Sequence, residues 1–326
     1  MGIFNWWRLG SSGFGYSSTA EDVTEGIDAT NLTAIVTGAT SGIGKETARV
    51  LALRGANVII PSRTIESGQS VKESLLEQNP RAKLQVMEMD LSSIRSIKSF
   101  ADSFNSSHTQ LNILINNAGT MACPYQLSMD GVEMQFAVNH LGHFLLTNLL
   151  LEKLKVTAKE TGIQGRIVNI SSATHTRVAD TSWIDLKKIN DKSTYRSFEA
   201  YSRSKLANIQ HANELSRCLQ EDGSNVIANS LHPGVIMTNI GRYLSPTIKP
   251  LLPLIKPFLK SIPQGAATIC YVALHPNIKD TSGKYFCNSN ETMPSSVARD
   301  RDVGKKLWDL SQDFLEKSGG KNTSSA

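Results

Sequence analysis

The feature that most constrains the fold of this chain is a glycine-rich turn that joins a short apolar run to an amphipathic segment. The apolar run covers residues 34–37, glycines follow at Gly38, Gly42 and Gly44, and helical spacing of apolar residues starts near Lys45. A strand, a glycine turn and a helix in this order form a site where backbone N–H groups and the helix dipole bind a dinucleotide pyrophosphate. The alternative, that the glycines only permit positive φ in a turn, accounts for one or two of them. The predicted phosphate-binding residues are Gly38, Thr40, Ser41, Gly42, Ile43 and Gly44.

Short apolar runs and helical patterns alternate along the rest of the chain. Such alternation predicts a parallel sheet that helices cover on both faces. We therefore expect an α/β protein with a single Rossmann-type, doubly wound parallel sheet of about seven strands. The predicted strands are 34–37, 58–61, 84–89, 113–115, 167–170, 226–231 and 284–286, and the predicted helices are 45–54, 66–78, 94–104, 133–156, 198–219 and 265–274.

Composition excludes several other classes of protein. Of 326 residues, 40% are apolar and 19% are charged, which is typical of a globular protein. The net charge of +5 (34 − 29) is spread along the chain and only 6% of the residues are aromatic, so no nucleic-acid surface is expected. Four separated cysteines without a CxxC pair indicate neither a metal site nor a disulfide framework. They are Cys123, Cys218, Cys270 and Cys287.

The N-terminal segment up to Tyr16 is rich in serine and glycine. Its apolar patch, residues 3–7, is too short for a secretory signal or a membrane-spanning helix. We expect a frayed tail here. The alternatives are a weak transit sequence and an interfacial anchor through Trp6 and Trp7.

Residues 244–263 interrupt the alternation, because five prolines punctuate an otherwise apolar stretch. Prolines at this frequency limit helices to about one or two turns. The wider region 241–263 also contains Lys249, Lys256 and Lys260 but no acidic residue. This pattern predicts an apolar lid over a binding site, or a membrane-facing flap, at 241–263. A lid of this kind favours a lipophilic substrate.

The residue after the second predicted strand bears on the choice of dinucleotide. In this fold an acidic residue about 20 positions beyond the last glycine binds the ribose 2′-hydroxyl of NAD(H). Here Arg63 lies 19 residues (63 − 44) beyond Gly44. A guanidinium supplies both charge and a bidentate fork for the 2′-phosphate of NADP(H), and Lys45 is placed to assist it. In the alternative, Arg63 is a solvated surface residue and Glu66 binds the ribose.

A tyrosine and a lysine four residues apart form the candidate catalytic pair. Tyr201 and Lys205 share one face of the helix predicted at 198–219. A phenol with an ordinary pKa of about 10 can donate and accept protons near neutral pH if a cation stabilises its phenolate. Because this spacing also arises by chance, its weight depends on the other motifs.

The motifs together, in their order along the chain, resemble the short-chain dehydrogenase/reductase family. The resemblance runs from about residue 32 to residue 286 and implies a nicotinamide-dependent oxidoreductase of CH–OH and C=O groups. The motifs are TGATSGIG at 37–44, NNAG at 116–119, Asn139, the serines at 171–172, Tyr201-x-x-x-Lys205 and Pro233-Gly234.

This resemblance assigns roles to single residues. It implies that Ser172 orients the substrate carbonyl, that Tyr201 transfers the proton and that Lys205 also binds the nicotinamide ribose. It implies that Asn139 holds a water of a proton relay. Further implied cofactor contacts are Asp90 at the adenine, Leu91 beside it, Asn117, Ala118 and Gly119 near the adenosine, and Pro233, Gly234 and Thr238 at the nicotinamide amide.

Several of these roles have purely structural alternatives. The hydroxyl of Ser172 can cap a strand end, Asp90 can cap a helix, Asn139 can make a polar bond inside a helix, and Thr238 can be a plain loop residue. Ser172 precedes Tyr201 by 29 residues (201 − 172), a longer interval than is usual in the family, so an insertion at 180–196 is implied.

Three histidines near these motifs are expected to be packing or surface residues. No acidic residue or cysteine stands near them to complete a metal shell. They are His140, His143 and His175.

Two groups of segments narrow the resemblance. Residues 140–147 and 171–175 are similar to the retinol-dehydrogenase-like branch of the family. Segments within 13–28 are similar to a plant subgroup associated with the protein translocon of the chloroplast inner envelope. This similarity implies a location at that membrane. The alternative is a cytoplasmic or membrane-peripheral enzyme.

The predicted activity is NADPH-dependent reduction of a ketone or aldehyde in a lipophilic substrate, such as a terpenoid, steroid, retinoid or long-chain aldehyde. Reduction is expected because cells usually keep the NADP(H) pool reduced. We predict an N-terminal extension over 1–30, an NADP(H)-binding catalytic domain over 31–290 and a C-terminal helix and tail over 291–326.

A second function follows from the plant resemblance alone. It is a redox-sensing, calmodulin-responsive component of the chloroplast import machinery with peripheral membrane contact. Candidate calmodulin targets are 249–260 and the helix predicted at 303–314, for which a solvated amphipathic helix is the alternative. Family relatives also imply a homodimer that pairs through 133–156 and 198–219.

Overall fold

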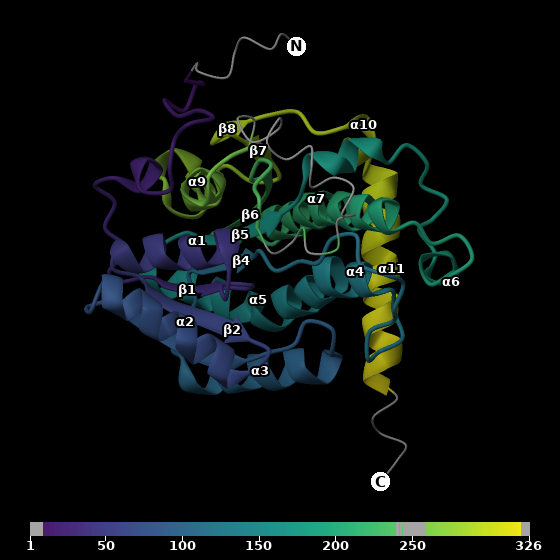
Figure 1. Cartoon of the computed structure of the whole chain (residues 1–326), viewed down its shortest axis with the longest axis horizontal. Helices are drawn as coiled ribbons and strands as arrows, with labels where there is room; N and C mark the ends of the chain where they lie inside the picture. The colour runs from purple at the N-terminus through teal and green to yellow at the C-terminus, as the bar shows by residue number, and fades with distance from the viewer. Residues whose placement is uncertain (1–8, 239–240, 242, 244–258, 321–326) are drawn as a thin grey trace.

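The computed structural model describes residues 9–238, 241, 243 and 259–320, without the side chains of 318–320. These residues form one sheet with the strand order β3-β2-β1-β4-β5-β6-β7-β8 (Figure 1). The first seven strands are parallel, and the two-residue β8 is antiparallel to β7. The predicted doubly wound α/β fold is confirmed. The strands are β1 (Thr33–Val36), β2 (Asn57–Ser62), β3 (Lys83–Glu88), β4 (Ile113–Asn116), β5 (Gly165–Ile170), β6 (Val226–His232), β7 (Tyr285–Cys287) and β8 (Asn290–Glu291).

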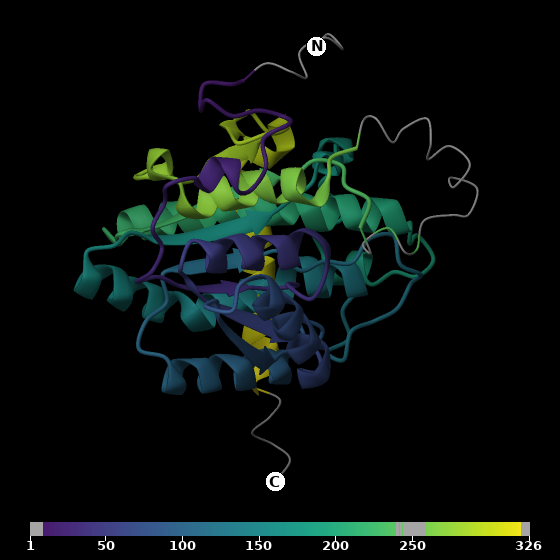
Figure 2. The same cartoon turned by 60° about the vertical axis from the view of Figure 1, so that its left-hand side comes forward.

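Helices cover both faces of the sheet, and alternate residues of one strand enter different cores. In β1, Ala34 and Val36 pack with one set of helices, whereas Ile35 packs with the other. The first set is α1 (Gly42–Leu53), α2 (Ile65–Gln78) and α9 (Ile262–Leu274), and the second is α3 (Ile94–Ser107), α5 (Gly142–Thr161) and α7 (Ser197–Glu221). Figure 2 shows these helices enclosing the sheet. Because the central strands are buried on both faces, they read as apolar runs in the sequence.

Local capping explains where several helices begin. The side chain of Thr64 accepts the Ser67 N–H at the start of α2, and Ser93 accepts the Ser96 N–H at the start of α3. Helix α9 starts with a full capping box, in which Ser261 and Gln264 bond each other's backbone N–H. These caps satisfy N–H groups that a helix leaves without partners at its first turn.

The helix predicted at 133–156 is interrupted in the structure. It consists of the short α4 (Met134–Phe136), a π-helical turn η2 (Ala137–Leu141) and α5. At the junction Gly142 lies against the Leu91 backbone, where a Cβ would approach the Leu91 carbonyl oxygen to 2.6 Å. Turns of this wider kind are frequent at functional sites.

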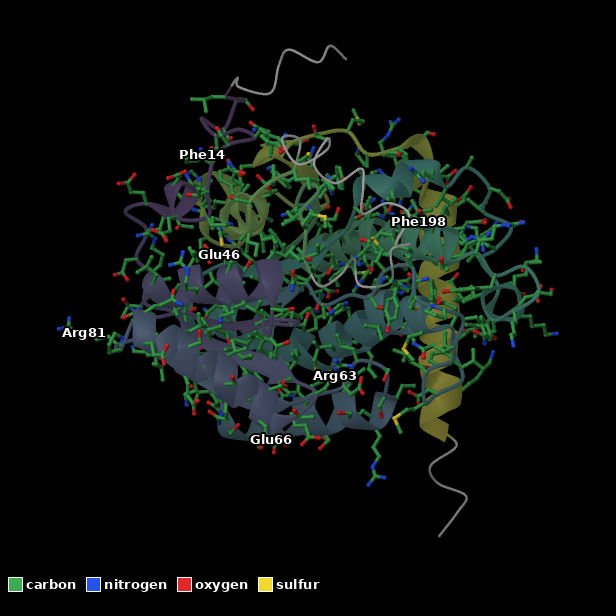
Figure 3. The ribbon with its side chains drawn as sticks, in the orientation of Figure 1. Phe14, Glu46, Arg63, Glu66, Arg81 and Phe198 are labelled. Carbon is green, nitrogen blue, oxygen red and sulfur yellow. The ribbon has the colours of Figure 1, made fainter. Side chains whose placement is uncertain are left out.

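The described part of the N-terminal segment is packed, so the expected frayed tail is wrong for residues 9–16. The Phe14 ring lies edge-on to Tyr271 and His275, with centroids 5.8 and 5.6 Å away. The Asn290 amide accepts the Ser12 N–H at 3.0 Å and donates to the Phe14 carbonyl at 3.0 Å. One partly buried aromatic side chain therefore packs this segment on α9, where Figure 3 labels Phe14, and two long-range hydrogen bonds connect it to β8. A short 3-10 helix, η1 (Asp22–Thr24), follows it.

The predicted insertion forms a packed excursion that includes α6 (Leu186–Ile189) and follows η3 (Ala173–Arg177). Trp183 is buried, and its ring centroid lies 6.2 Å from that of Phe136. The Tyr195 hydroxyl donates to the Cys123 carbonyl oxygen at 2.8 Å and accepts from Gln135 at 2.8 Å. The excursion folds back on the domain, which keeps the end of β5 close to α7 despite the longer interval.

The C-terminal region crosses the outside of the domain. After η7 (Pro276–Ile278) and the last strands come α10 (Ser296–Arg299) and α11 (Arg301–Gly320), and Figure 1 shows α11 in yellow across α7. Trp308 of α11 packs edge-on against Phe144 with centroids 4.9 Å apart. Gln210 of α7 donates to the carbonyls of Val297 and Asp300 at 2.7 and 3.0 Å. The helix predicted at 303–314 is therefore part of the folded domain.

Most of the lid predicted at 241–263, including its apolar part at 251–258, lies outside the described residues. The first candidate calmodulin target, 249–260, lies outside them as well, except for its last two residues. Among the helices that the structure describes, none combines the length and apolar character that crossing a membrane requires.

Candidate active site

The predicted site residues gather at the carboxyl edge of the parallel sheet. Thr37 follows β1, Asn117 follows β4, Ser172 comes just after β5, and Pro233 follows β6. Because these strands are neighbours and parallel, their ends meet along one edge. Ligands of doubly wound folds bind at this edge, beside the point where the strand order reverses.

The glycine loop fits closely between β1, α1 and the loop after β4. Gly38 and Gly42 have positive φ, at +68° and +56°. A Cβ on Gly38 would lie 2.8 Å from the Ala118 Cα, and one on Gly44 would lie 2.3 Å from the Gly38 carbonyl oxygen. Ser41 precedes α1 but makes no side-chain capping bond, which leaves the first-turn N–H groups to an anionic ligand. The loop is therefore a cradle that a pyrophosphate fits and that a side chain would fill.

Thr37 connects the glycine loop to the loop after β4 by hydrogen bonds. Its hydroxyl oxygen accepts the N–H groups of Asn117 and Ala118, both at 2.9 Å. The Asn117 side chain donates to the Thr37 carbonyl oxygen at 2.8 Å. In this structure Asn117 and Ala118 thus hold the cofactor loop in place through Thr37.

Ser172, Tyr201 and Lys205 lie together at the end of β5. Tyr201 is 5% exposed, and its hydroxyl interacts electrostatically with that of Ser172. The Lys205 ammonium is 5.7 Å from the centroid of the Tyr201 ring and donates to the Ile170 carbonyl at 3.0 Å. Ser171 faces the other way, because its hydroxyl donates to the Lys205 carbonyl at 2.7 Å. Ser172 is therefore the serine that faces the phenol.

Burial controls the ionisation of the pair, and it corrects the expected direction for the phenol. Burial raises the pKa of Tyr201 to about 12, although the interaction with the Ser172 hydroxyl opposes this rise. Burial also lowers the pKa of Lys205 to about 8. In the chain without ligand burial thus raises the pKa of Tyr201, and the expected lowering by Lys205 is not seen. A protonated phenol at neutral pH is suited to donate a proton.

The Asn139 side chain makes hydrogen bonds to two other parts of the protein, Thr120 and Ser204. Its oxygen accepts the Thr120 N–H at 2.8 Å, and its amide nitrogen donates to the Thr120 carbonyl at 2.9 Å and to Ser204 at 3.0 Å. Both amide hydrogens are thus used inside the protein. This arrangement matches the structural alternative for the side chain, and the proton relay stays a prediction.

Gly119 lies beside the catalytic residues. A Cβ at this position would be 3.2 Å from the Asn139 side-chain oxygen and 3.5 Å from the Lys205 ammonium. The resemblance implies a contact with the adenosine end of the cofactor, which stays a prediction, and the structure places Gly119 next to Lys205. The missing side chain leaves room there.

The three predicted nicotinamide contacts lie beside the glycine loop and just after β6. A Cβ on Gly42 would come within 3.1 Å of the Thr238 methyl group, so Thr238 lies over the start of α1. Gly234 has a φ of +100°, and a Cβ there would meet the side chain of Lys260 at 2.6 Å. The buried Pro233 leads into this turn.

Arg63 is exposed at the end of β2, and Glu66 is exposed on the first turn of α2. Lys45, which was expected to assist Arg63, donates instead to Ser74 of α2 at 2.9 Å. Figure 3 labels Arg63, Glu66 and the remote Arg81. The exposed guanidinium of Arg63 remains available to a 2′-phosphate.

The predicted adenine contacts at the end of β3 also serve the local fold. Asp90 accepts the N–H and the hydroxyl of Ser92, both at 2.8 Å, in the turn before α3, whose cap is Ser93 and not Asp90. Leu91 is buried, and its carbonyl lies against Gly142. Any adenine contact of Asp90 has to use the part of the carboxylate that Ser92 leaves open.

Two residues that organise the site, Thr37 and His143, were not predicted from the sequence to do so. Thr37 was assigned to the first strand without a role for its hydroxyl, and His143 was expected to be a packing residue. His143 contacts Thr37 through one ring nitrogen and the Asn139 backbone through the other. The interval of four residues between Asn139 and His143 was a usable signal, because it places them on neighbouring turns of one helix.

Within the described residues, no three His, Cys, Asp or Glu side chains are arranged to hold a metal ion. The four cysteines there are free.

Comparison with known proteins decides the family. Residues 32–182 match the family model described as short chain dehydrogenase. Short-chain dehydrogenase TIC 32 A, chloroplastic, from Brassica napus is 54% identical over 309 residues, which cover 95% of this chain and 96% of that protein. The chain belongs to the short-chain dehydrogenase family. As a member it is an oxidoreductase of alcohol and carbonyl groups, and the family binds NAD(P).

Other relatives agree with this assignment. Human retinol dehydrogenase 12 is 42% identical over 281 residues, which cover 86% of this dehydrogenase and 85% of that protein. A crystal structure of an uncharacterised protein from Mycobacterium Paratuberculosis superposes with a TM-score of 0.71 at 31% identity, covering 90% and 97% of the two chains. The resemblance to the retinol-dehydrogenase-like branch and to the plant subgroup is thus confirmed.

The pKa of Lys205 predicts how the reaction of this dehydrogenase depends on pH. The kcat/KM for the dinucleotide, which reports the free enzyme, should fall as the pH rises through about 8, because Lys205 then loses its charge. Tyr201, with a pKa of about 12, stays protonated in this range. The measurement is a pH profile between 6 and 10. In Lys205→Arg the cation persists, so the decline should disappear even if the maximum is lower. An unchanged decline in that variant would reject the assignment to Lys205.

Proposed function

We propose that this dehydrogenase uses NADPH to reduce a ketone or aldehyde in a lipophilic substrate. The observation that carries the proposal is the group formed by the partly buried Ser172 and the buried Tyr201 and Lys205, at the same edge of the sheet as the glycine loop. The overall change is one carbonyl, one NADPH and one proton to one alcohol and one NADP⁺.

Each side chain has a separate task in this reaction. When bound, the nicotinamide cofactor supplies a hydride to the carbonyl carbon. The Ser172 hydroxyl holds the carbonyl oxygen, and Tyr201 donates its proton to that oxygen. Lys205 stabilises the phenolate that Tyr201 becomes, and this stabilisation is strong because both groups are buried. Holding both reactants in contact also removes much of the encounter entropy.

Exposed apolar side chains beside the site support a lipophilic substrate. Val235 and Met237, just after Gly234, are 61% and 49% exposed. Phe198 is 40% exposed and precedes Tyr201 by three residues, so both lie on the same face of α7. Apolar groups left open to water around a polar centre are typical of a site that takes an apolar ligand.

The choice of NADPH rests on Arg63. An exposed guanidinium at the end of β2, with no acidic residue at that position, suits a 2′-phosphate. Among solved structures of the same fold, RhlG from Pseudomonas aeruginosa is a complex with NADP, with a TM-score of 0.63, 24% identity and coverage of 79% and 95% of the two chains.

Arg63→Ala should weaken NADPH binding about tenfold and leave NADH binding nearly unchanged. The tenfold weakening of NADPH binding corresponds to the loss of one charge-assisted hydrogen bond, which contributes about 1.5 kcal/mol. The two dissociation constants can be measured by fluorescence titration. Arg81→Ala is the matched control, since Arg81 is also exposed but lies well away from Arg63 (Figure 3). Equal losses for both dinucleotides would contradict a contact with the 2′-phosphate.

The activity itself is tested by following NADPH consumption over a panel of carbonyl compounds. The panel should include retinoid, steroid, terpenoid and long-chain aldehydes together with short sugars. We expect turnover of lipophilic members. Activity on small polar sugars alone would refute the substrate class.

The second candidate is a redox-sensing, calmodulin-responsive component of the import machinery at the chloroplast inner envelope. Its support is the similarity over nearly the whole chain to the chloroplastic relatives from Brassica napus. In the structure Leu307 of α11 is buried and Trp308 packs on Phe144, so calmodulin could bind this face only if α11 leaves α7. The same helix lies against α7 and would border any homodimer formed through it. Pull-down with calcium–calmodulin, with and without NADPH, separates this candidate from a purely metabolic enzyme.

A further inference from the structure

His143 links two parts of the site that lie far apart in the sequence, the start of the glycine loop and the turn that contains Asn139. The side chain is 1% exposed. Its Nε2 lies 2.9 Å from the Thr37 hydroxyl, and its Nδ1 lies 3.0 Å from the Asn139 carbonyl oxygen. Thr37 starts the glycine loop, whereas Asn139 belongs to the π-helical turn that contacts Ser204 on the catalytic helix.

The chemistry of the two partners determines where the hydrogens are. A carbonyl oxygen can only accept, so the Nδ1 of His143 carries the hydrogen and Nε2 is an acceptor. The Thr37 oxygen already accepts two backbone N–H groups, and its own hydrogen is therefore free to go to Nε2. The other acceptor within reach, the Ile115 carbonyl, is farther away at 3.3 Å.

A neutral ring is required for this pattern, since a charged imidazole would have two donors. Burial lowers the pKa of His143 to about 4, and the charge of Lys205 acts in the same direction. The ring is therefore neutral at physiological pH and bridges a hydroxyl donor to a carbonyl acceptor.

We propose that His143 is a positioning residue that fastens the turn of Asn139 to the start of the glycine loop, and so sets the catalytic side chains at the correct distance from the dinucleotide. The inference rests on the proposed function, which assigns these two elements to catalysis and to cofactor binding. Without the bridge the two elements remain folded, but their relative position is held by fewer bonds. Displacements of about 1 Å are enough to slow a reaction strongly.

His143→Phe removes both bonds and keeps a ring of similar volume. We expect it to weaken NADPH binding about fivefold and to reduce kcat about fivefold or more. The reason is that the loss of one hydrogen bond changes an equilibrium or a rate about fivefold. The control is His140→Phe, one turn earlier on the same chain segment. His140 is 2% exposed and bonds Ser311 at 2.9 Å, away from the glycine loop. This control should lower the melting temperature and leave NADPH affinity unchanged.

A double-mutant cycle with Thr37→Val separates positioning from general destabilisation. After Thr37→Val, the additional loss of NADPH affinity from His143→Phe should be smaller, because the shared bond is already absent. If His143→Phe does not fold, His143→Asn serves instead. Its short amide reproduces the donor to Asn139 but does not reach Thr37, so NADPH affinity should fall with a smaller change in kcat.

The outcomes distinguish this inference from the proposed function. Normal NADPH binding and turnover in the unaltered enzyme, with unchanged affinity and kcat in the His143 variants, would overturn the inference alone. Additive losses in the cycle would overturn it too. An unaltered enzyme that binds no dinucleotide would overturn both.

Discussion

Tyr201→Phe is expected to reduce carbonyl reduction by about 10²–10⁴-fold while NADPH still binds. The ring is buried and packed, so phenylalanine keeps the fold and removes only the hydroxyl that interacts with Ser172. The loss therefore measures the contribution of a positioned proton donor. Steady-state turnover on the best substrate of the carbonyl panel, together with fluorescence titration of NADPH, checks both parts of the expectation.

Tyr271→Phe is the matched control for this substitution. Tyr271 is 4% exposed and thus as buried as Tyr201, but it lies on α9 beside Phe14. Tyr271→Phe removes a phenol hydroxyl outside the site. Its turnover should stay within about twofold of that of the unaltered enzyme, as for a substitution away from the reacting groups. Near-normal turnover of Tyr201→Phe with cofactor bound would remove the phenol from its proposed role.

Gly38→Ala is expected to weaken NADPH binding between about 5- and 150-fold, which corresponds to about 1–3 kcal/mol of overpacking. The new Cβ would lie 2.8 Å from the Ala118 backbone, and neither backbone segment can move without opening the cradle. The positive φ of +68° adds strain of about 1–2 kcal/mol to the folded protein. Titration with NADPH measures the first effect, and thermal unfolding measures the second.

The variant Gly131→Ala separates the effect of backbone strain from the effect of the steric clash. Gly131 has a similar φ of +77°, but nothing lies within 4 Å of its Cβ position. This variant should lose a similar amount of stability from strain and keep its NADPH affinity. If both variants bind NADPH equally well, the close fit of the glycine loop does not matter for the cofactor.

Features carried by short contiguous segments were predictable from the sequence. The glycine loop and the Tyr201–Lys205 pair depend on spacing along one turn or one helix, and the structure has both elements where the pattern indicated. The parallel sheet covered by helices followed from the alternation of apolar runs and helices, because parallel strands need helical crossovers. The bounds of most elements differ by only a few residues at either end.

Features that depend on distant segments were not predictable in this way. The packing of Phe14 on α9 needs residues more than 250 positions later in the chain, such as Tyr271 and His275 (271 − 14 = 257). The π-helical turn within 134–161 reflects close contacts of that helix with its neighbours, and helical periodicity does not report them. The partner of Lys45, Ser74 of α2, likewise comes from a neighbouring element.

The sequence by itself determined the fold class, the place of the cofactor loop and the residues able to transfer a proton, because each of these follows from local spacing and residue type. Only the tertiary structure decided the ionisation of Tyr201 and Lys205 and the bridging role of His143. The physical reason is that a pKa and a hydrogen-bond network depend on how much water and which partners surround a group. Those surroundings come from segments that meet only when the whole sheet has formed.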